Sequence, residues 1–358
     1  MSYIFVGIIF ILLIDFIFQT FYFKRIFGQG PLEIKTFDGS NQPYHPSVYF
    51  FKKGWNGFQY WMVLTPYPMH VVYKDRWECP CIYCSNDGIR WNAPNQFINP
   101  LDDLTIEEME HKDFFSDPHL VVNSNKLECW YRLTDRKRDK TFILRRISKD
   151  GKLWSEREIL IDPEEEHIID TIGDMVRSPA IIFQEMYKMW YVDNKKNVGQ
   201  RNLCFSTSAD GEKWERRQLC TLLGYTTNPW HIDVSFINGV YYLIVYDLDK
   251  LTLWKSKDGI QFSFIKILLS PNLKYGSFYS DGLYRSCLVW NQSVYLCYFS
   301  AFDHKSTYIG LMQGKDIEHM EIISCKKMRY KLSDYIYMYF INRKRSISMF
   351  KNKIKETL

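Results

Sequence analysis

The pattern of apolar and polar positions between residues 40 and 325 repeats five times along the chain. Each repeat opens with polar residues that pass into an apolar run, as at 45–50, and a second apolar run follows, as at 60–63. A third run leads into a turn and a fourth run leaves it. Short runs separated by turns predict strands. Four antiparallel strands repeated five times predict an all-β five-bladed β-propeller over residues 40–325.

The turn between the third and fourth runs is itself repeated and reads Ser-x-Asp-Gly-x-x-Trp. Asp-Gly between two apolar runs predicts a tight turn, because glycine accepts a positive φ. The Ser and Asp side chains can bond nearby backbone N–H groups. The motif occurs at residues 85–91, 148–154 and 208–214, with Phe for Trp at 256–262, and in a decayed form at 314–317. We therefore interpret the aspartates of these turns as structural.

The first 23 residues form an apolar run in which Asp15 is the one charged residue. A run of about 21 apolar residues is long enough to cross a bilayer as a helix, and the pattern of a cleaved signal peptide is missing. We therefore expect residues 1–25 to be a transmembrane helix that anchors the protein to a membrane. Lys24 and Arg25 favour a cytoplasmic propeller, whereas an enzyme that degrades glycans would face outward.

Composition and charge add to this picture. The chain has 358 residues and a net charge of +5, and its basic residues are concentrated in a C-terminal extension at 326–358. We expect this extension to be a closing strand or an interfacial helix. The remainder is slightly acidic, so nucleic acid is not expected as a partner.

The cysteines bear on metal binding. Cys79, Cys81 and Cys84 cluster among the nine cysteines, but no second half-site accompanies them. We therefore predict no metal site of this kind and no required cofactor. A structural calcium ion stays open as an alternative, although no feature of the sequence indicates one.

The polar residues that begin each repeat point to a common site. In a propeller the first strand of every blade lines the central channel, so five polar strand starts should meet at one mouth. The residues concerned are His45, Asp117, His119, Arg177, His231, Asp233 and Arg285, with Asp281 just before the fifth repeat and Glu78 before the third strand of the first. Each has an ordinary structural explanation as well, such as a strand-start turn for Asp117. Their joint occurrence at equivalent positions favours a functional site.

Together these features resemble the arabinanase, levansucrase and invertase superfamily, and in particular the type of glycoside hydrolase family 43. The resemblance covers residues 40–325 and rests on the five repeats, the Ser-x-Asp-Gly turns and the acidic strand start. Sialidase-type propellers carry a similar turn. The resemblance implies three catalytic acids, one from each of the first three blades. Asp117 matches the second, whereas His45 and Arg177 stand where an Asp and a Glu are implied.

The residues and the resemblance suggest action on a carbohydrate. Glycoside hydrolysis needs two carboxyl groups, one protonated and one ionised. The candidate catalytic residues are Asp117, Asp233 and Glu78. The candidate substrate-binding residues are His45, His119, Arg177, His231, Asp281 and Arg285. The arginines would suit an acidic glycan, and a histidine could replace a missing carboxyl group.

Three functions remain open on these grounds. The first is a glycoside hydrolase acting on a cell-surface or capsular polysaccharide. The second is a carbohydrate-binding propeller without catalysis. The third is a membrane-tethered scaffold in polysaccharide biosynthesis. The missing acids of blades one and three favour the second, whereas the convergence of polar residues favours the first.

Overall fold

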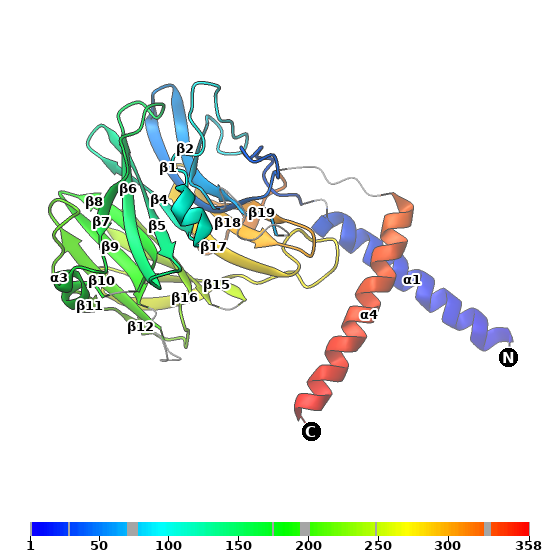
Figure 1. Cartoon of the computed structure of the whole chain (residues 1–358). Helices are drawn as coiled ribbons and strands as arrows, with labels where there is room; N and C mark the ends of the chain where they lie inside the picture. The colour runs from blue at the N-terminus through cyan, green and yellow to red at the C-terminus, as the bar shows by residue number, and fades with distance from the viewer. Residues whose placement is uncertain are drawn as a thin grey trace.

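Five antiparallel sheets form the blades of a propeller, and two long helices project from it (Figure 1). The computed structural model describes residues 2–27, 29–69, 78–173, 175–193, 201–247, 249–325 and 331–357. The long helices are α1 (Ser2–Phe27) and α4 (Leu332–Thr357), and two short ones, α2 (Ile106–Glu110) and α3 (Glu166–Thr171), lie between blades. The prediction of an all-β five-bladed propeller is confirmed.

Each blade is built from strands that follow one another along the chain. Blade one contains β1 (Pro43–Trp55), β2 (Phe58–Pro66) and β3 (Cys81–Ser85). Blade two contains β4 (Phe114–Asn123), β5 (Lys126–Asp135), β6 (Lys140–Ser148) and β7 (Glu158–Ile161). Blade three contains β8 (Val176–Gln184), β9 (Met186–Asp193), β10 (Asn202–Ser208) and β11 (Gln218–Leu219).

The last two blades complete the ring. Blade four contains β13 (His231–Ile237), β14 (Val240–Asp247), β15 (Lys250–Ser256) and β16 (Gln261–Leu269), and β12 (Thr221–Leu223) adds to β16 in parallel. Blade five contains β17 (Gly282–Trp290), β18 (Tyr295–Phe302), β19 (Thr307–Gly314) and β20 (Glu321–Ile322). The first strand of every blade contacts the first strands of both neighbouring blades, so the ring is closed.

The segment before blade one helps to seal this ring. The backbone N–H of Leu32 donates to the carbonyl oxygen of Ile309 in β19 at 2.8 Å. Leu32 and Ile34 are buried among apolar residues of blades one and five. Chain positions far apart in the sequence therefore meet at the hub, as the repeats predicted.

The Ser-x-Asp-Gly turns join neighbouring blades as well as neighbouring strands. In blade two, Ser148 Oγ accepts from the N–H of Gly151, and Asp150 Oδ1 accepts from two further backbone N–H groups. Gly151 has a φ of +75°, and a Cβ atom there would come within 2.2 Å of the Trp61 ring in blade one. Other turns repeat this arrangement, with Gly88 against Tyr298, Gly211 against Trp130 and Gly259 against Trp190. The structural interpretation of these turns is confirmed.

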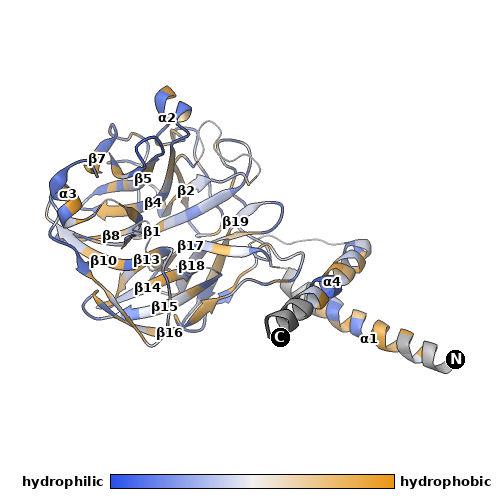
Figure 2. Ribbon diagram, turned by 60° about the horizontal axis from the view of Figure 1, so that its bottom comes forward, coloured by the Kyte–Doolittle hydropathy of each residue, from blue (hydrophilic) through white to orange (hydrophobic). Residues whose placement is uncertain are grey.

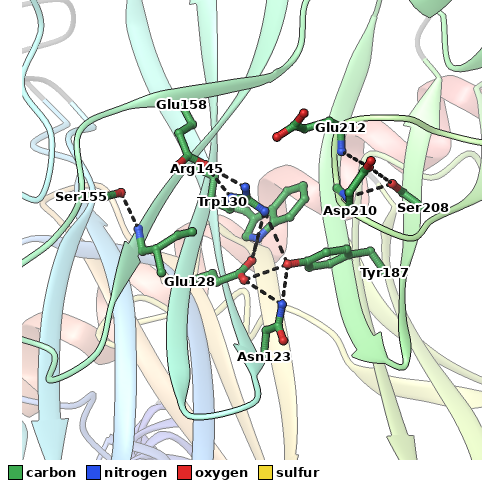
Figure 3. Close-up of polar contacts among 12 residues, drawn as sticks. Asn123, Glu128, Trp130, Arg145, Ser155, Glu158, Tyr187, Ser208, Asp210 and Glu212 are labelled. Carbon is green, nitrogen blue, oxygen red and sulfur yellow. Dashed lines mark hydrogen bonds and ion pairs between the residues drawn. The ribbon is translucent and has the colours of Figure 1, made fainter.

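A buried polar cluster connects blades two and three (Figure 3). The Glu128 carboxylate accepts hydrogen bonds from Trp130 Nε1 and from the Tyr187 hydroxyl, both at 2.8 Å, and from Asn123 Nδ2 at 3.2 Å. Arg145 lies 3.8 Å from the same carboxylate. Both carboxylate oxygens of Glu128 thus have partners, which stabilises the blade interface and leaves no open group for chemistry.

The two long helices cross each other beside the propeller (Figure 2). Asp15 of α1 accepts a hydrogen bond from the Tyr339 hydroxyl of α4 at 2.7 Å and forms an ion pair with Arg343. Within the described ranges, no helix is both long and apolar enough to span a bilayer. The predicted membrane anchor at residues 1–25 and the membrane localisation are therefore wrong. The carboxylate that interrupts the apolar run is used to bind α4.

The C-terminal extension forms the helix α4 and not a closing strand. Asn342 Oδ1 accepts from the backbone N–H of Tyr275 at 2.6 Å, which docks α4 on the loop before β17. Residues 326–330 of the predicted extension lie outside the described residues. The exact domain boundaries stay a prediction.

Candidate functional site

The backbone at the start of three inner strands takes an unusual conformation that directs side chains into the channel. His45, Asp117 and Ser178 have φ values of 52°, 52° and 49°, and each precedes a proline. The strand register shifts at the same three places. Left-handed non-glycine residues cost about 1–3 kcal/mol each and are frequent at functional sites. Their recurrence at equivalent positions in blades one, two and three marks this end of the channel.

A cavity of about 280 Å³ occupies this end of the channel. Its walls come from the strand starts of all five blades and from the loop that precedes β3. Its lining residues include His45, Glu78, Ser116, Asp117, Arg132, Lys140, Arg177, His231 and the aromatic residues Tyr67, Trp230 and Tyr284. The structure therefore brings together His45, Asp117, Arg177, His231 and Glu78 from the sequence-based set.

Asp117 is fully buried at the centre of this group. Its Oδ2 atom accepts from the Ser178 backbone N–H at 3.1 Å and lies 3.0 Å from Arg132 Nε. Its Oδ1 atom lies 3.3 Å from His231 Nδ1 and 3.6 Å from Arg285 Nη1. Burial raises the pKa of Asp117, but Arg132, His231 and Arg285 outweigh burial and hold it well below its usual value. The ionised form of Asp117 is thus favoured, with a hydrogen bond at Oδ2 and only ion-pair contacts at Oδ1.

Two histidines stand beside Asp117 with open ring nitrogens. His45 Nδ1 lies 3.0 Å from the Thr65 hydroxyl, while His231 Nδ1 faces Asp117. The Nε2 atoms of both rings are buried without a hydrogen-bond partner among the described residues. Burial lowers the pKa of each histidine, and the nearby Asp117 charge offsets this only in part. The lowered pKa values favour the neutral form of both rings, in which one ring nitrogen can accept a proton.

Glu78 reaches the cavity from the loop before β3, where its backbone has a φ of 54°. Its side chain is buried, and Oε2 has no hydrogen-bond partner within the described ranges. Burial and the Asp117 charge raise the pKa of Glu78 well above its usual value, against a smaller opposing effect of Arg132. The surroundings therefore favour the protonated form of Glu78 and the ionised form of Asp117.

Arg177 lines the cavity and forms no ion pair with any described carboxylate. Its guanidinium carbon lies 5.1 Å from the centroid of the Trp230 ring, a cation–π contact. Burial lowers the pKa of Arg177, and the like charge of Arg132 adds to this effect. Arg177 is half-buried, and the Asp117 charge offsets the lowering of its pKa only in part.

A second cavity of about 420 Å³ lies at the other end of the channel and is lined by the later residues of all five inner strands. Asp233 and His119 line this cavity, with His119 Nδ1 4.0 Å from Asp233 Oδ1. Burial raises the pKa of Asp233 to about 6 and lowers that of His119 to about 3. Arg285, which donates to the Pro179 carbonyl oxygen at 3.0 Å, lies between the two ends. Asp233 and Asp117 therefore line different cavities.

Asp281 lies outside both cavities. It is exposed at the surface and lies 3.8 Å from Arg345 of α4. Arg132, in contrast, lines the cavity but was absent from the sequence-based set, because a single arginine within the apolar strand β5 gives no repeat signal. Its position opposite Ser116 in the register of β4 and β5 was the available clue.

The arrangement of possible metal ligands bears on whether the protein could bind a metal ion. Within the described ranges, no group of three or more His, Cys, Asp or Glu side chains is arranged to hold a metal ion. The expectation that no cofactor is required stays a prediction.

Comparison with known proteins relates this geometry to enzymes that act on sugars. No family model matches the chain. The A type blood N-acetyl-alpha-D-galactosamine deacetylase of Flavonifractor plautii is 27% identical over 296 residues, covering 69% of this chain. The alignment covers 37% of that relative, so the chain spans little more than a third of its length.

Two solved structures share the architecture. The N-acetylgalactosamine deacetylase from F. plautii, in complex with blood group B trisaccharide, matches with a TM-score of 0.67 and 21% identity, over 81% of this chain and 95% of that chain. CoXyl43, a family 43 β-xylosidase/α-arabinofuranosidase from a compost metagenome, matches with a TM-score of 0.58 and 11% identity, over 83% and 98%. The resemblance to the five-bladed propeller glycosidases that the sequence suggested is thus confirmed in the fold.

Proposed function

We propose that this chain is a hydrolase that acts on a glycan in the cavity around Asp117, and that it removes the acetyl group from an N-acetylated amino sugar. The observation that carries the proposal is the contrast between Asp117 and His231. Ion-pair contacts with Arg132 and Arg285 and a hydrogen bond from the Ser178 N–H hold Asp117 ionised, so it is a weak base and nucleophile, whereas His231 Nε2 has no partner among the described residues. A neutral histidine held by a carboxylate is a suitable general base.

The proposed reaction uses two protons held in the cavity. His231 Nε2 takes a proton from water as the water oxygen attacks the acetyl carbonyl carbon. Asp117 stabilises the resulting imidazolium across the 3.3 Å contact. The tetrahedral intermediate collapses, the C–N bond breaks, and protonated Glu78 donates its proton to the leaving nitrogen. Acetate and the free amine leave, and proton exchange with solvent restores both side chains.

The named activity of the F. plautii relative supports this reaction, because that protein is a deacetylase of an N-acetylated sugar. The aromatic rings of Tyr67, Trp230 and Tyr284 in the cavity wall offer flat faces for a sugar ring.

Glycoside hydrolysis is the second candidate, and the opposite protonation of Glu78 and Asp117 favours it. It would require Asp117 to leave its partners Arg132 and His231 in order to reach a sugar. Glycan binding without turnover is the third candidate. In that case His231 Nε2 and Glu78 Oε2 would form hydrogen bonds with sugar hydroxyl groups and would take no part in a reaction.

One experiment separates these candidates. The full chain is incubated with an oligosaccharide that ends in N-acetylgalactosamine, and the products are followed by mass spectrometry and by an acetate assay. We expect loss of one acetyl group with every glycosidic bond intact. Shorter oligosaccharides would favour glycoside hydrolysis instead, and bound but unchanged oligosaccharide would favour a binding protein.

Variants of the cavity residues test whether the reaction takes place in this cavity. Replacing a general acid or base typically lowers kcat by about 10²–10⁴-fold, so we expect losses of this size for His231→Gln and Glu78→Gln. Asp233→Asn is the matched control, because Asp233 is equally buried but lines the opposite cavity. Equal losses in all three variants would contradict the assignment. Circular dichroism confirms that each variant is folded.

A further inference from the structure

We infer that the glycan bound in this cavity carries a negatively charged group, a carboxylate or a sulfate, and that Arg177 binds it. The inference deepens the proposed function and rests on it, since it names the class of the substrate. Its starting point is that Arg177 lines the cavity without any ion pair to a described carboxylate.

The other arginines near the cavity have partners within the protein. Arg132 lies 3.0 Å from Asp117 and donates to the Thr134 hydroxyl at 3.2 Å. Arg285 lies 3.6 Å from Asp117 and donates to a backbone carbonyl. One carboxylate therefore serves two arginines at ion-pair distance, and Arg177 makes no such pair with a described carboxylate. Glu78 forms no ion pair with Arg177 either, and burial and the Asp117 charge raise the pKa of its carboxyl group well above the usual value.

The surroundings of Arg177 fit a ligand better than a solvated surface position. Its guanidinium packs over the Trp230 ring, and Trp230 Nε1 donates to the Tyr284 hydroxyl at 3.0 Å, which orients both aromatic rings of the cavity wall. The buried atoms His45 Nε2, Glu78 Oε2 and Ser116 Oγ have no hydrogen-bond partners in the described part of the chain. Sugar hydroxyl groups would bond these atoms while the planar guanidinium binds the oxyanion through two N–H groups.

Calorimetry on the full chain at pH 7 tests the inference with four probes. These are methyl β-D-glucuronide, methyl β-D-glucoside 6-sulfate, methyl β-D-glucoside and inorganic sulfate. We expect one or both of the charged sugars to bind at least about tenfold more tightly than the neutral glucoside. A gain of this size in affinity corresponds to the free energy of one charge-assisted hydrogen bond. Added salt should reduce this preference.

Variants test whether Arg177 causes the preference for charged sugars. We expect Arg177→Gln to lower the affinity for charged sugars to that for the neutral glucoside, and Arg177→Lys to retain part of the preference. Arg201→Gln is the matched control, because Arg201 lies over the same Trp230 ring at 4.1 Å but does not line the cavity. It should keep the full preference.

Each outcome has a defined meaning. Equal binding of charged and neutral sugars by the wild type, or an unchanged preference in Arg177→Gln, overturns the inference and leaves the proposed function standing. Inorganic sulfate binding as tightly as the sulfated sugar also overturns it, because the site would then recognise any anion. Binding of none of the sugars overturns the inference alone, because these probes carry no N-acetyl group and the deacetylation assay tests the proposed function separately.

Discussion

The turn aspartates at the blade junctions and Asp117 in the channel carry the same carboxyl group, but the groups that surround it differ. Asp150 accepts hydrogen bonds from the backbone N–H groups of Lys152 and Leu153 and from Ser148, and these bonds lower its pKa. Asp117 is surrounded by polar side chains whose other atoms, such as Arg285 Nε and His231 Nε2, have no hydrogen-bond partner among the described residues. The side-chain oxygen of Asp150 thus has its hydrogen bonds within the turn, whereas several polar atoms around Asp117 have none.

This difference separates structure from function within one repeated fold. The turns satisfy every local polar group with nearby backbone, so they can recur around the ring and stabilise it. The channel end gathers polar and charged side chains from all five blades and leaves some of their atoms without hydrogen bonds, which costs free energy. A protein retains such an arrangement where a ligand completes it, and so the channel is the place to look for function.

The largest effect is expected from Asp117→Asn. Removing one member of a buried charge cluster typically costs about 3–5 kcal/mol, because Arg132 and Arg285 lose their shared counterion. Asp150→Asn should cost about 1 kcal/mol, since its side-chain oxygen can still accept from the backbone. Urea denaturation of both variants measures the two losses. Equal losses would contradict the distinction between the two settings.

Gly151→Ala breaks a turn in a different way. Alanine at a φ of +75° is strained, and its Cβ would come within 2.2 Å of Trp61. We expect a loss of about 2–4 kcal/mol in unfolding free energy, the sum of the strain and of overpacking. Gly39→Ala is the matched control, with a φ of +74° and no atom within 4 Å of the added Cβ. It should lose only about 1–2 kcal/mol, and a similar loss in both variants would exclude a packing role for the turn.

Asp233 predicts a pH dependence for the other end of the channel. Its pKa of about 6 in the folded state lies above the unfolded value, so its contribution to stability is full at low pH and is lost as the pH rises through about 6. Relative to Asp233→Asn, the wild type should lose up to about 3 kcal/mol between pH 4 and pH 7. Urea denaturation of both proteins across this range measures the difference, and parallel stability curves would contradict the raised pKa.

The contrast between the turns and the channel also explains which features of the protein could be predicted from the sequence. The turns were predictable because their chemistry is local, within seven residues, and repeats along the chain. The convergence of His45, Asp117 and His231 followed from the repeats as well, since equivalent strand starts meet at one mouth. Arg132 gave no such signal, because its role depends on which residue of the neighbouring strand it opposes.

Two further predictions depended on contacts that hydropathy and spacing do not contain. The apolar run of α1 suggested a membrane anchor, but Asp15 within it binds α4. Asp233 was expected opposite Asp117 across one funnel. The two side chains line opposite cavities, because a strand that begins at one end of the channel carries its later residues toward the other.

The smallest effect is expected from Asp281→Asn, the acid that the sequence placed beside the channel mouth. Asp281 is exposed and lies 3.8 Å from Arg345, an exposed ion pair worth at most about 1 kcal/mol. We expect a loss of about 0.5 kcal/mol or less in unfolding free energy, which raised salt should abolish. The double variant with Arg345→Gln should lose no more than either single variant, because both changes remove the same contact. A loss comparable to that of Asp117→Asn would mean that Asp281 belongs with the channel residues after all.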